Sequence, residues 1–253
     1  MATIYEVSEL AGVSLATVSR VMNNSDKVAA KTRQKVEAAM RELGYRPNTI
    51  AQSLASNRSN SVGVLVPELH GPFFGAMLSN IEDELRTAGK HVIITAGHSD
   101  EEKEKESIEF LASRKCDALI LHVYAISNEY IESLRENSVP IVVIGRDIPG
   151  MENGCISLDN EYGSYLATKC LLELGHRDLA YISGPLWKSD GQQRLVGFRR
   201  ALREYEIDFQ ERLLAEGDYE ESSGRQAMKR LLQQDIPFTG LVCGNDEMAA
   251  GAI

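Results

Sequence analysis

Apolar positions near the N-terminus recur every three or four residues, which is the period of an amphipathic helix. Thr3 and Glu6 have the spacing of a capping box that begins the first helix. Val7, Leu10 and Ala11 are expected to share the buried face of this helix. The pattern predicts a short helix that contributes one side of a small core.

A tight turn and a second helix follow. Gly12 permits the turn because glycine adopts positive φ without steric cost, and Ser14 is suited to cap the next helix. Val18, Val21 and Met22 point back towards the core. The outward face is left with Leu15, Ala16, Thr17, Ser19, Arg20 and Asn23.

A third helical pattern runs from about residue 30 to 43, and Gly44 and Pro47 provide its stop. A helix, a tight turn and a second helix form the unit that places its second helix in the DNA major groove. A solvated helix face normally carries long charged side chains, whereas hydroxyls, an Asn and one Arg suit phosphate oxygens and base edges. DNA binding is therefore the favoured interpretation, and an ordinary helical hairpin without a partner is the alternative.

Residues 47–60 form a joint in which Ile50, Ala51, Leu54 and Ala55 share a helical stripe. A helix of about eight residues is marginal in water, so it needs a partner to order it. A plain interdomain linker is the alternative, although it gives no reason for Leu54 to be apolar.

From residue 62 onward, short apolar runs alternate with longer helical patterns, which is typical of parallel α/β structure. The first series has predicted strands at VGVLVPE, HVIITAG, ALILHV and PIVVIG and helices at 74–88, 102–114 and 128–137. A second series is expected to begin at CISLDN and to continue through helices at 161–174, 191–206 and 222–234 and strands at DLAYISG, LLAEGDY and TGLVCGN. Two such sheets in succession place a ligand cleft between them, at the carboxyl ends of the strands.

Polar and aromatic residues gather near the predicted strand ends, and neither a phosphate-binding glycine pattern nor a GxSxG or HExxH motif is present. An enzyme therefore lacks an obvious nucleophile or metal site. The candidate ligand contacts are Phe73, Phe74, Arg146, Asp190, Arg194, Tyr219, Asn245 and Asp246. Carboxylate, amide and guanidinium groups pair with sugar hydroxyls, and an aromatic ring covers the C–H face of a sugar. For each residue a purely structural role is an equal alternative.

Composition limits the class of protein. The chain has 253 residues and 43% hydrophobic content, without an apolar run long enough to span a membrane and without a secretory leader pattern, so we expect a cytoplasmic protein with no membrane partner. The chain has four dispersed cysteines without CxxC spacing, Cys116, Cys155, Cys170 and Cys243. This spacing predicts buried free thiols rather than zinc or disulfide sites, and no cofactor is expected.

The charge is unevenly divided along the chain. The net charge is −10, but residues 1–58 contain eight basic and five acidic residues, so this segment carries +3 and the remainder −13. A basic head on an acidic body concentrates attraction for phosphate in one module. Chance fluctuation in a short segment is the alternative.

The motifs of the chain together resemble the LacI/GalR family of bacterial transcription regulators. The resemblance rests on AGVSLATVSRVMNN, ELGYRPNTIAQSLAS, PFFGAM, DNEYGSYLAT, ELGHRDLAYISGP, RLVGF and NDEMAAG, and it is strongest to the galactose-repressor branch. It implies an α/β protein with a helix-turn-helix headpiece (1–46), a hinge helix and tether (47–60), and a periplasmic-binding-protein-like core of two subdomains (61–158 and 159–253). It also implies a homodimer that binds a near-palindromic operator of double-stranded DNA under the control of a small effector, such as a galactose-like sugar.

The resemblance also implies residue roles. Positions that match Leu15, Ala16 and Arg20 read bases in the family, and positions that match Ser14, Thr17, Ser19 and Asn23 touch phosphates. In the hinge helix, which also contains Ala51, the position of Leu54 is an apolar wedge inserted into the minor groove. The positions of Arg194 and Asp246 hold effector, with Asp190, Tyr219 and Asn245 on matching segments beside them.

The chain departs from the family pattern at three points. Gly145 stands where some sugar-responsive members carry a polar side chain, and Ala29 stands where many carry a Ser that caps the third helix. Family members usually continue well beyond NDEMAAG, so we expect a partial sequence with an incomplete second subdomain. The alternatives to a sugar-controlled repressor are a regulator that answers a purine, nucleoside or phosphorylated sugar, a transport-type sugar-binding module, and an enzyme.

Overall fold

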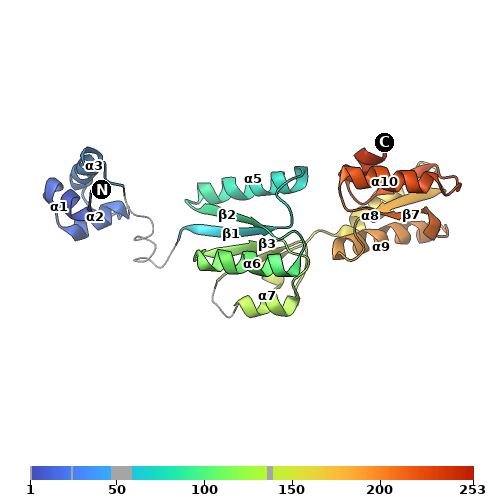
Figure 1. Ribbon diagram of the computed structural model, residues 1–253, viewed down its shortest axis with the longest axis horizontal. Helices are drawn as coiled ribbons and strands as arrows, with labels where there is room; N and C mark the ends of the chain where they lie inside the picture. The colour runs from blue at the N-terminus through green and yellow to red at the C-terminus, as the bar shows by residue number, and fades with distance from the viewer. Residues whose placement is uncertain (1, 24, 47–58, 136–138) are drawn as a thin grey trace. The chain divides into compact units, whose positions relative to one another are not determined.

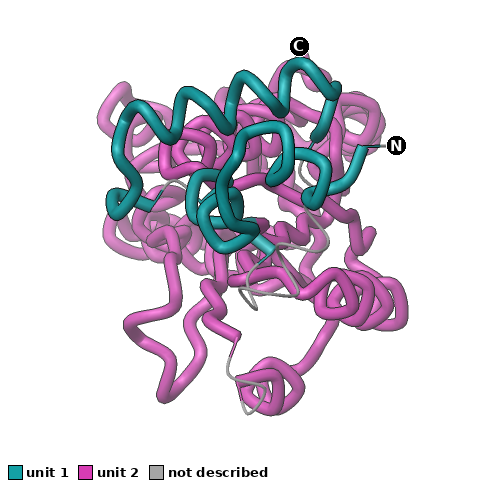
Figure 2. The backbone as a smooth tube through the Cα atoms, turned by 90° about the vertical axis from the view of Figure 1, so that its left-hand side faces the viewer, with its two compact units in different colours: residues 1–60 teal, residues 61–253 magenta. Residues whose placement is uncertain are grey.

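The computed structural model describes residues 2–23, 25–46, 59–135 and 139–253. The chain divides into two compact units, residues 1–60 and residues 61–253, which are coloured separately in Figure 2.

In its described residues, 2–23, 25–46 and 59–60, the first unit contains three helices, α1 (Ile4–Ala11), α2 (Leu15–Met22) and α3 (Ala30–Glu42). The capping box of Thr3 and Glu6 is present, and Gly12 ends α1 in the left-handed conformation at φ 63°. The hydroxyl of Ser14 caps α2 by accepting the Thr17 N–H. The three helices and the turn are therefore confirmed where the sequence predicts them.

The headpiece core is a narrow apolar cluster shared by the three helices. Its buried members are Val7, Ala11, Val18, Val21, Val36 and Ala39. The prediction that Leu10 is buried is wrong, since its side chain is 47% exposed. Leu10 lies beyond the edge of the stripe that Val7 and Ala11 define, and α1 is too short to bury a broad face.

The second unit begins with a parallel five-stranded sheet in the order β2-β1-β3-β4-β5. Its strands are β1 (Ser61–Val66), β2 (His91–Ala96), β3 (Ala118–Leu121), β4 (Ile141–Ile144) and β5 (Cys155–Ile156). Its helices are α5 (Pro72–Thr87), α6 (Glu101–Ser113), α7 (Asn128–Arg135) and the 3-10 turn η1 (Glu152–Gly154). In Figure 1, α5 lies on one side of this sheet and α6 and α7 on the other. The main core forms under α6 and α7, around Leu65, Ile108, Leu121 and Ile131.

The segment CISLDN was expected to begin the second sheet, and this expectation is wrong. Cys155 pairs with Val143 and Ile156 pairs with Ile144, so β5 completes the edge of the first sheet. The two-residue strand is too short for its pattern to show which sheet it joins, because a parallel pairing is decided by tertiary packing.

The remainder forms a parallel three-stranded sheet in the order β7-β6-β8. Its strands are β6 (Leu179–Ser183), β7 (Leu214–Glu216) and β8 (Gly240–Cys243). Its helices are α8 (Asn160–Glu173), α9 (Ser189–Glu204), α10 (Glu221–Leu232), α11 (Asp246–Ala252) and the 3-10 turn η2 (Glu211–Leu213). In Figure 1, α10 and α9 lie on opposite sides of the sheet. The two core clusters agree with this view, because Tyr181 of β6 packs with α8 and α9 whereas its neighbour Ile182 packs with α10 and α11.

The predicted helices of the core are confirmed to within two residues at each described end, and the end predicted for 128–137 lies outside the described residues. In the described part of the chain, no helix is long and apolar enough to cross a membrane, and no cluster of His, Cys, Asp and Glu is suited to hold a metal ion. All four cysteines are free thiols. Cys116 is buried and Cys155 and Cys243 are half-buried, whereas the expectation of burial is wrong for Cys170, which lies on the exposed side of α8.

Candidate functional site

The outward face of α2 carries the residues that the sequence marks for DNA. Ser14, Leu15, Ala16, Arg20 and Asn23 are exposed. Thr17 and Ser19 are half-buried at the edge of the face. No hydrogen bond or ion pair engages the guanidinium of Arg20 within the described part of the headpiece, so this group is available to a ligand.

Two side chains fix the ends of α2. The Ser14 Oγ lies 3.0 Å from the Thr17 Oγ1 and 3.2 Å from the Thr17 N, so one hydroxyl both caps the helix and orients the next. At the other end, Arg33 of α3 donates from Nη1 to the Val21 carbonyl oxygen at 3.5 Å. Its Nη2 donates to the carbonyl oxygen of Ser25, just beyond α2, at 2.9 Å. The outward face is thus carried by a helix that is held at both ends. The predicted hinge contacts Ala51 and Leu54 lie outside the described residues.

The second unit contains a cleft with a cavity of about 620 Å³, within the range of small-molecule sites. Seven of the eight predicted contacts line it: Phe73, Phe74, Asp190, Arg194, Tyr219, Asn245 and Asp246. The eighth, Arg146, does not. Its guanidinium turns into the part of the second unit that is built on the five-stranded sheet, which we call the first subdomain. Its Nη2 donates to the carbonyl oxygen of Ile126 at 2.9 Å, and burial lowers the pKa of Arg146. The prediction of Arg146 as a cleft contact is therefore corrected.

Asp190 is the most connected carboxylate of the cleft. Its side chain is 8% exposed, and its Oδ2 accepts from the Tyr219 hydroxyl at 2.9 Å and from the Tyr124 hydroxyl at 3.4 Å. Burial raises the pKa of both phenols, and the neighbouring carboxylate raises them further, so both remain protonated donors. The other oxygen, Oδ1, is buried and without a hydrogen-bond partner in the described residues. A buried acceptor of this kind is a position where a ligand hydroxyl is stabilising.

Tyr219 is held in an unusual backbone conformation at the cleft. Its φ is 78°, in the left-handed region that an aromatic residue rarely adopts. Asn245 stabilises this conformation by donating from Nδ2 to the Tyr219 carbonyl oxygen at 2.8 Å, while its Oδ1 accepts the Met248 N–H and caps α11. Gly184 leaves the space for the phenol, because a Cβ there would lie 2.1 Å from the Tyr219 Cζ.

Arg194 on α9 joins two segments of the cleft wall. Its Nε donates to the Asn160 Oδ1 at 2.8 Å, and its Nη1 donates to the Gly244 carbonyl oxygen. The guanidinium lies 5.5 Å from the centre of the Tyr219 ring, within cation–π distance. These contacts fix the plane of the guanidinium, which is the condition for directional pairing with ligand oxygens.

The first subdomain contributes an aromatic wall. The rings of Phe73 and Phe74 are 5.2 Å apart, and Phe74 lies 5.4 Å from the imidazole of His122. His122 is 4% exposed, and burial lowers its pKa to about 4, so the imidazole is neutral at physiological pH. Gly145 leaves room for this ring, because a Cβ at Gly145 would lie 2.9 Å from the His122 Nε2.

Lys188 places a cation among three aromatic rings of the cleft. Its Nζ lies 4.3 Å from the ring centre of Tyr124, 5.3 Å from that of Trp187 and 5.9 Å from that of Tyr219. Burial lowers its pKa, and the nearby carboxylate of Asp190 opposes this effect.

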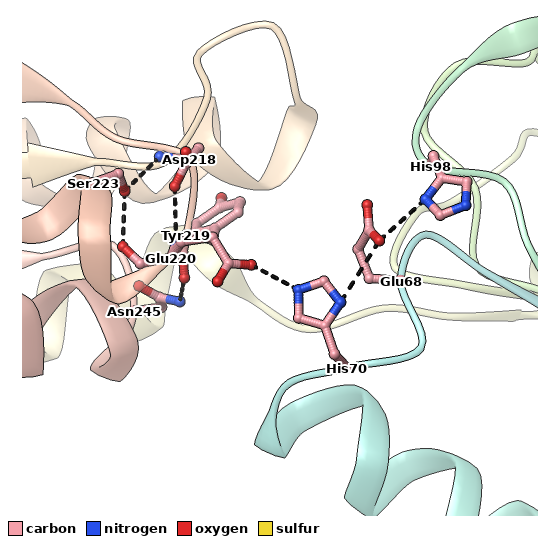
Figure 3. A network of polar contacts seen from close by, with 8 residues as sticks. All are labelled: Glu68, His70, His98, Asp218, Tyr219, Glu220, Ser223 and Asn245. Carbon is pink, nitrogen blue, oxygen red and sulfur yellow. Dashed lines mark hydrogen bonds and ion pairs between the residues drawn. The ribbon is translucent and has the colours of Figure 1, made fainter.

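The rim of the cleft is bridged by a chain of imidazoles and carboxylates, which Figure 3 shows from close by. The His70 Nε2 lies 3.1 Å from the Glu220 Oε1, and its Nδ1 lies 3.8 Å from the Glu68 Oε2. The same Glu68 oxygen lies 3.2 Å from the His98 Nδ1. The chain connects residues that follow β1 and β2 with the segment that follows β7.

The charge of the cleft is strongly negative. Six carboxylates line it, namely Glu68, Asp190, Asp218, Glu220, Asp246 and Glu247, against the two cations Lys188 and Arg194. Burial and the neighbouring acids raise the pKa of Glu247. The lining therefore favours a neutral, hydroxyl-rich ligand over an anion.

Sequence reasoning missed several lining residues, among them His122, Tyr124, Asn160 and Lys188. His122 directly follows the run ALIL, Tyr124 comes two residues later, and Asn160 directly follows CISLD, so the rule that ligands bind beyond strand ends would have found them. Lys188 carries no such signal, because its place depends on the turn before α9.

The comparisons with known proteins agree with both parts of this description. Residues 3–48 match the bacterial regulatory proteins, lacI family, and residues 59–253 match the periplasmic binding proteins and sugar binding domain of LacI family. The whole chain is 42% identical to the HTH-type transcriptional regulator GalR of Escherichia coli (strain K12), of which it covers 74%. It is 36% identical to the HTH-type transcriptional repressor PurR of Proteus mirabilis (strain HI4320), of which it covers 75%.

Solved structures show the same likeness. The lac repressor dimer bound to operator and the anti-inducer ONPF aligns with a TM-score of 0.88 and 32% identity over 99% of this chain and 76% of that chain. The transcriptional regulator CelR in complex with cellobiose aligns with a TM-score of 0.67 and 31% identity over 100% of this chain and 76% of that chain. The chain belongs to the LacI family of bacterial regulatory proteins and is a transcriptional repressor of the LacI/GalR type rather than an enzyme.

Proposed function

We propose that this repressor binds a near-palindromic operator as a homodimer in the cytoplasm, and that a neutral, galactose-like sugar in the cleft controls its affinity for DNA. The observation that carries the effector assignment is the lining of the cleft, which combines hydrogen-bonding side chains with aromatic rings and carries more negative than positive charges. A sugar offers hydroxyls to the former and C–H faces to the latter.

Individual contacts support the sugar. The buried Asp190 Oδ1 and the buried His122 Nδ1 both lack hydrogen-bond partners in the described residues, and both residues line the cleft, so its wall has unused capacity to hydrogen-bond a polyol. The relatives point the same way, since GalR is 42% identical and one aligned structure is a complex with cellobiose.

The DNA assignment rests on the outward face of α2. Arg20 is suited to base edges, Leu15 and Ala16 to methyl and shape contacts, and Ser14, Thr17, Ser19 and Asn23 to phosphates. Ala51 and Leu54 complete the proposal as minor-groove contacts of a hinge helix that orders on the operator. The lac repressor, bound to its operator as a dimer, is the relevant solved relative.

Two other effectors are less well supported. A phosphorylated sugar would bring negative charge into a cleft that six carboxylates line. A purine has flat faces that Phe74, Tyr124 or Tyr219 can stack on, and PurR is also a relative, so a purine is the second candidate.

Selection of bound duplexes from a random pool tests DNA binding, and a symmetric site with a central pyrimidine–purine step is the expected result. The affinity for the selected duplex is then measured at fixed salt with D-galactose, D-galactose 6-phosphate, hypoxanthine and no ligand. A change with D-galactose alone supports the proposal. A response to hypoxanthine alone supports the purine alternative, and equal affinities under all four conditions contradict control by these ligands.

A further inference from the structure

The loop after β3 carries Tyr124 into the cleft, and a buried carboxylate behind it holds its backbone. Glu104 of α6 is 1% exposed. Its Oε1 accepts the Tyr124 N–H at 3.0 Å, and its Oε2 accepts the N–H groups of Ala125 at 3.0 Å and of Ile126 at 2.9 Å. Three consecutive backbone donors of the loop therefore end on one carboxylate that does not line the cavity.

A second charged side chain holds the same loop from the direction of β4. Arg146 donates from Nη2 to the Ile126 carbonyl oxygen at 2.9 Å, and the charge of Glu104 stabilises its charged form. A buried carboxylate is costly unless hydrogen bonds compensate it, and here three charge-assisted bonds do so. Gly97 leaves space for this arrangement, because a Cβ there would lie 2.6 Å from the Glu104 Cγ.

The loop matters because Tyr124 is a first-subdomain partner of several cleft residues. Its hydroxyl lies 3.4 Å from the Asp190 Oδ2 and 3.2 Å from the His122 Nε2. Its ring lies 4.3 Å from the Lys188 Nζ, and its centre lies 6.5 Å from the ring centre of Trp187. A shift of the 124–126 backbone would disturb all four contacts.

We propose that Glu104, together with Arg146, is a positioning residue that sets Tyr124 in place and so preorganises the cleft for its effector. The expected influence of Glu104 on ligand affinity rests on the proposed function, in which the cleft binds a neutral sugar. Its influence on the position of Tyr124 is independent of that function, because the contacts of Glu104 exist without any ligand.

The substitution Glu104→Gln tests the proposal with little change of shape. The amide has one accepting oxygen in place of two, so at least one loop N–H loses its acceptor. We expect about tenfold weaker binding of D-galactose by titration calorimetry. We also expect a changed emission of Trp187, the sole tryptophan, in the ligand-free protein. Glu106→Gln, an exposed carboxylate on the same helix, is the matched control and should change neither measurement.

A second pair of variants separates positioning from a general loss of structure. If Glu104 acts through Tyr124, Glu104→Gln weakens D-galactose binding much less in a Tyr124→Ala background than in the native chain. Arg146→Met removes the second side chain that holds the 124–126 loop, and it should shift the Trp187 emission in the same direction as Glu104→Gln. This variant keeps the test decisive if Glu104→Gln folds poorly. Equal losses in both backgrounds, or an unchanged Trp187 emission in Glu104→Gln and Arg146→Met, would overturn the proposal. Absence of D-galactose binding in the native chain would instead contradict the proposed function. The Trp187 emission of Glu104→Gln and Arg146→Met would then still test whether Glu104 and Arg146 position Tyr124.

Discussion

The headpiece face and the cleft are built in opposite ways. The headpiece residues proposed to meet DNA in the major groove lie between positions 14 and 23, and a single capped helix presents them. The cleft residues come from segments that follow β1, β3, β4, β5, β6, β7 and β8. A local site requires only that one helix forms, whereas an assembled site requires that both sheets, and the turns between strands and helices, pack as they do.

The two sites also differ in how their side chains are engaged. The guanidinium of Arg20 on the headpiece makes no hydrogen bond in the described residues, whereas that of Arg194 in the cleft donates to Asn160 and Gly244. Substitution of Arg20 should therefore change binding without changing stability. Substitutions in or beneath the cleft should change both.

The largest effect is expected at the contact between α8 and α9, which places the cleft residues Asn160 and Arg194. At Gly197 a Cβ would lie 2.0 Å from the Glu161 carbonyl oxygen, and backbone cannot yield as a flexible side chain can. Gly197→Ala should destabilise this subdomain by about 3 kcal/mol or more. Urea unfolding followed by Trp187 emission measures the change.

The matched control for this substitution is Gly163→Ala on α8, where a Cβ meets no atom within 4 Å. Alanine there should leave stability equal or slightly higher, because it favours the helix. Equal destabilisation by both substitutions would contradict a specific close contact between α8 and α9.

The next effect concerns pH and the buried imidazole of His122. The pKa of His122 in the folded chain is about 4, so between pH 6.5 and pH 4 this imidazole binds a proton in the unfolded chain but not in the folded chain. The free energy of unfolding therefore has its full value above pH 6.5 with respect to this group, and it decreases by up to about 3 kcal/mol as the pH falls towards 4. In His122→Gln the loss should be absent, so its unfolding free energy should fall less steeply between pH 6.5 and 4 than that of the native chain.

Comparison of the two chains at each pH cancels the carboxylates, which titrate in both. His91→Gln, which removes an exposed imidazole at the start of β2, controls for the loss of one histidine and should follow the native curve. Parallel curves for His122→Gln and the native chain would show that His122 does not carry this pH dependence.

The headpiece offers the complementary test, in which binding changes alone. Arg20→Ala should weaken binding of the selected operator duplex by about 10- to 100-fold, the range for one bidentate contact to a base. The midpoint of thermal unfolding and the affinity for D-galactose should remain unchanged, since Arg20 is exposed. Fluorescence anisotropy at fixed salt measures the operator affinity.

Arg41→Ala is the control for charge, because Arg41 is an exposed cation on α3. It should weaken binding of all duplexes slightly and by the same factor. If Arg20→Ala behaves in the same way, Arg20 contributes only non-specific attraction.

The same contrast explains what could be predicted from the sequence. The capping box at Thr3, the turn at Gly12 and the cap at Ser14 follow from short-range rules, and all are confirmed. In the cleft, residue type and strand ends pointed to seven residues that line the cavity, and to Arg146, which does not line it. Its direction is decided by the Ile126 carbonyl oxygen, twenty positions away in the sequence, and no periodicity reports such a contact.

The edge strand β5 was misassigned for the same reason. Its two residues pair with β4, and a segment this short has no alternation from which its sheet could be inferred. The unusual φ of Tyr219 also has no sequence signal, since it depends on Asn245 and on the space at Gly184. The sequence rules failed at these positions because contacts between residues far apart in the sequence decide their structure.

The smallest predicted effect lies at the start of α3. Ala29 occupies the N-cap position with φ −58° and ψ 141°, and no side-chain hydrogen bond caps the helix. A serine hydroxyl there can accept a first-turn N–H, so Ala29→Ser should stabilise the headpiece by about 1 kcal/mol. Denaturant unfolding followed by circular dichroism measures the shift in midpoint. Ala38→Ser places the same hydroxyl at an exposed position inside the helix, where it should be neutral or slightly destabilising. An increase in stability for Ala29→Ser but not for Ala38→Ser would support local capping, the same short-range rule that places the starts of α1 and α2.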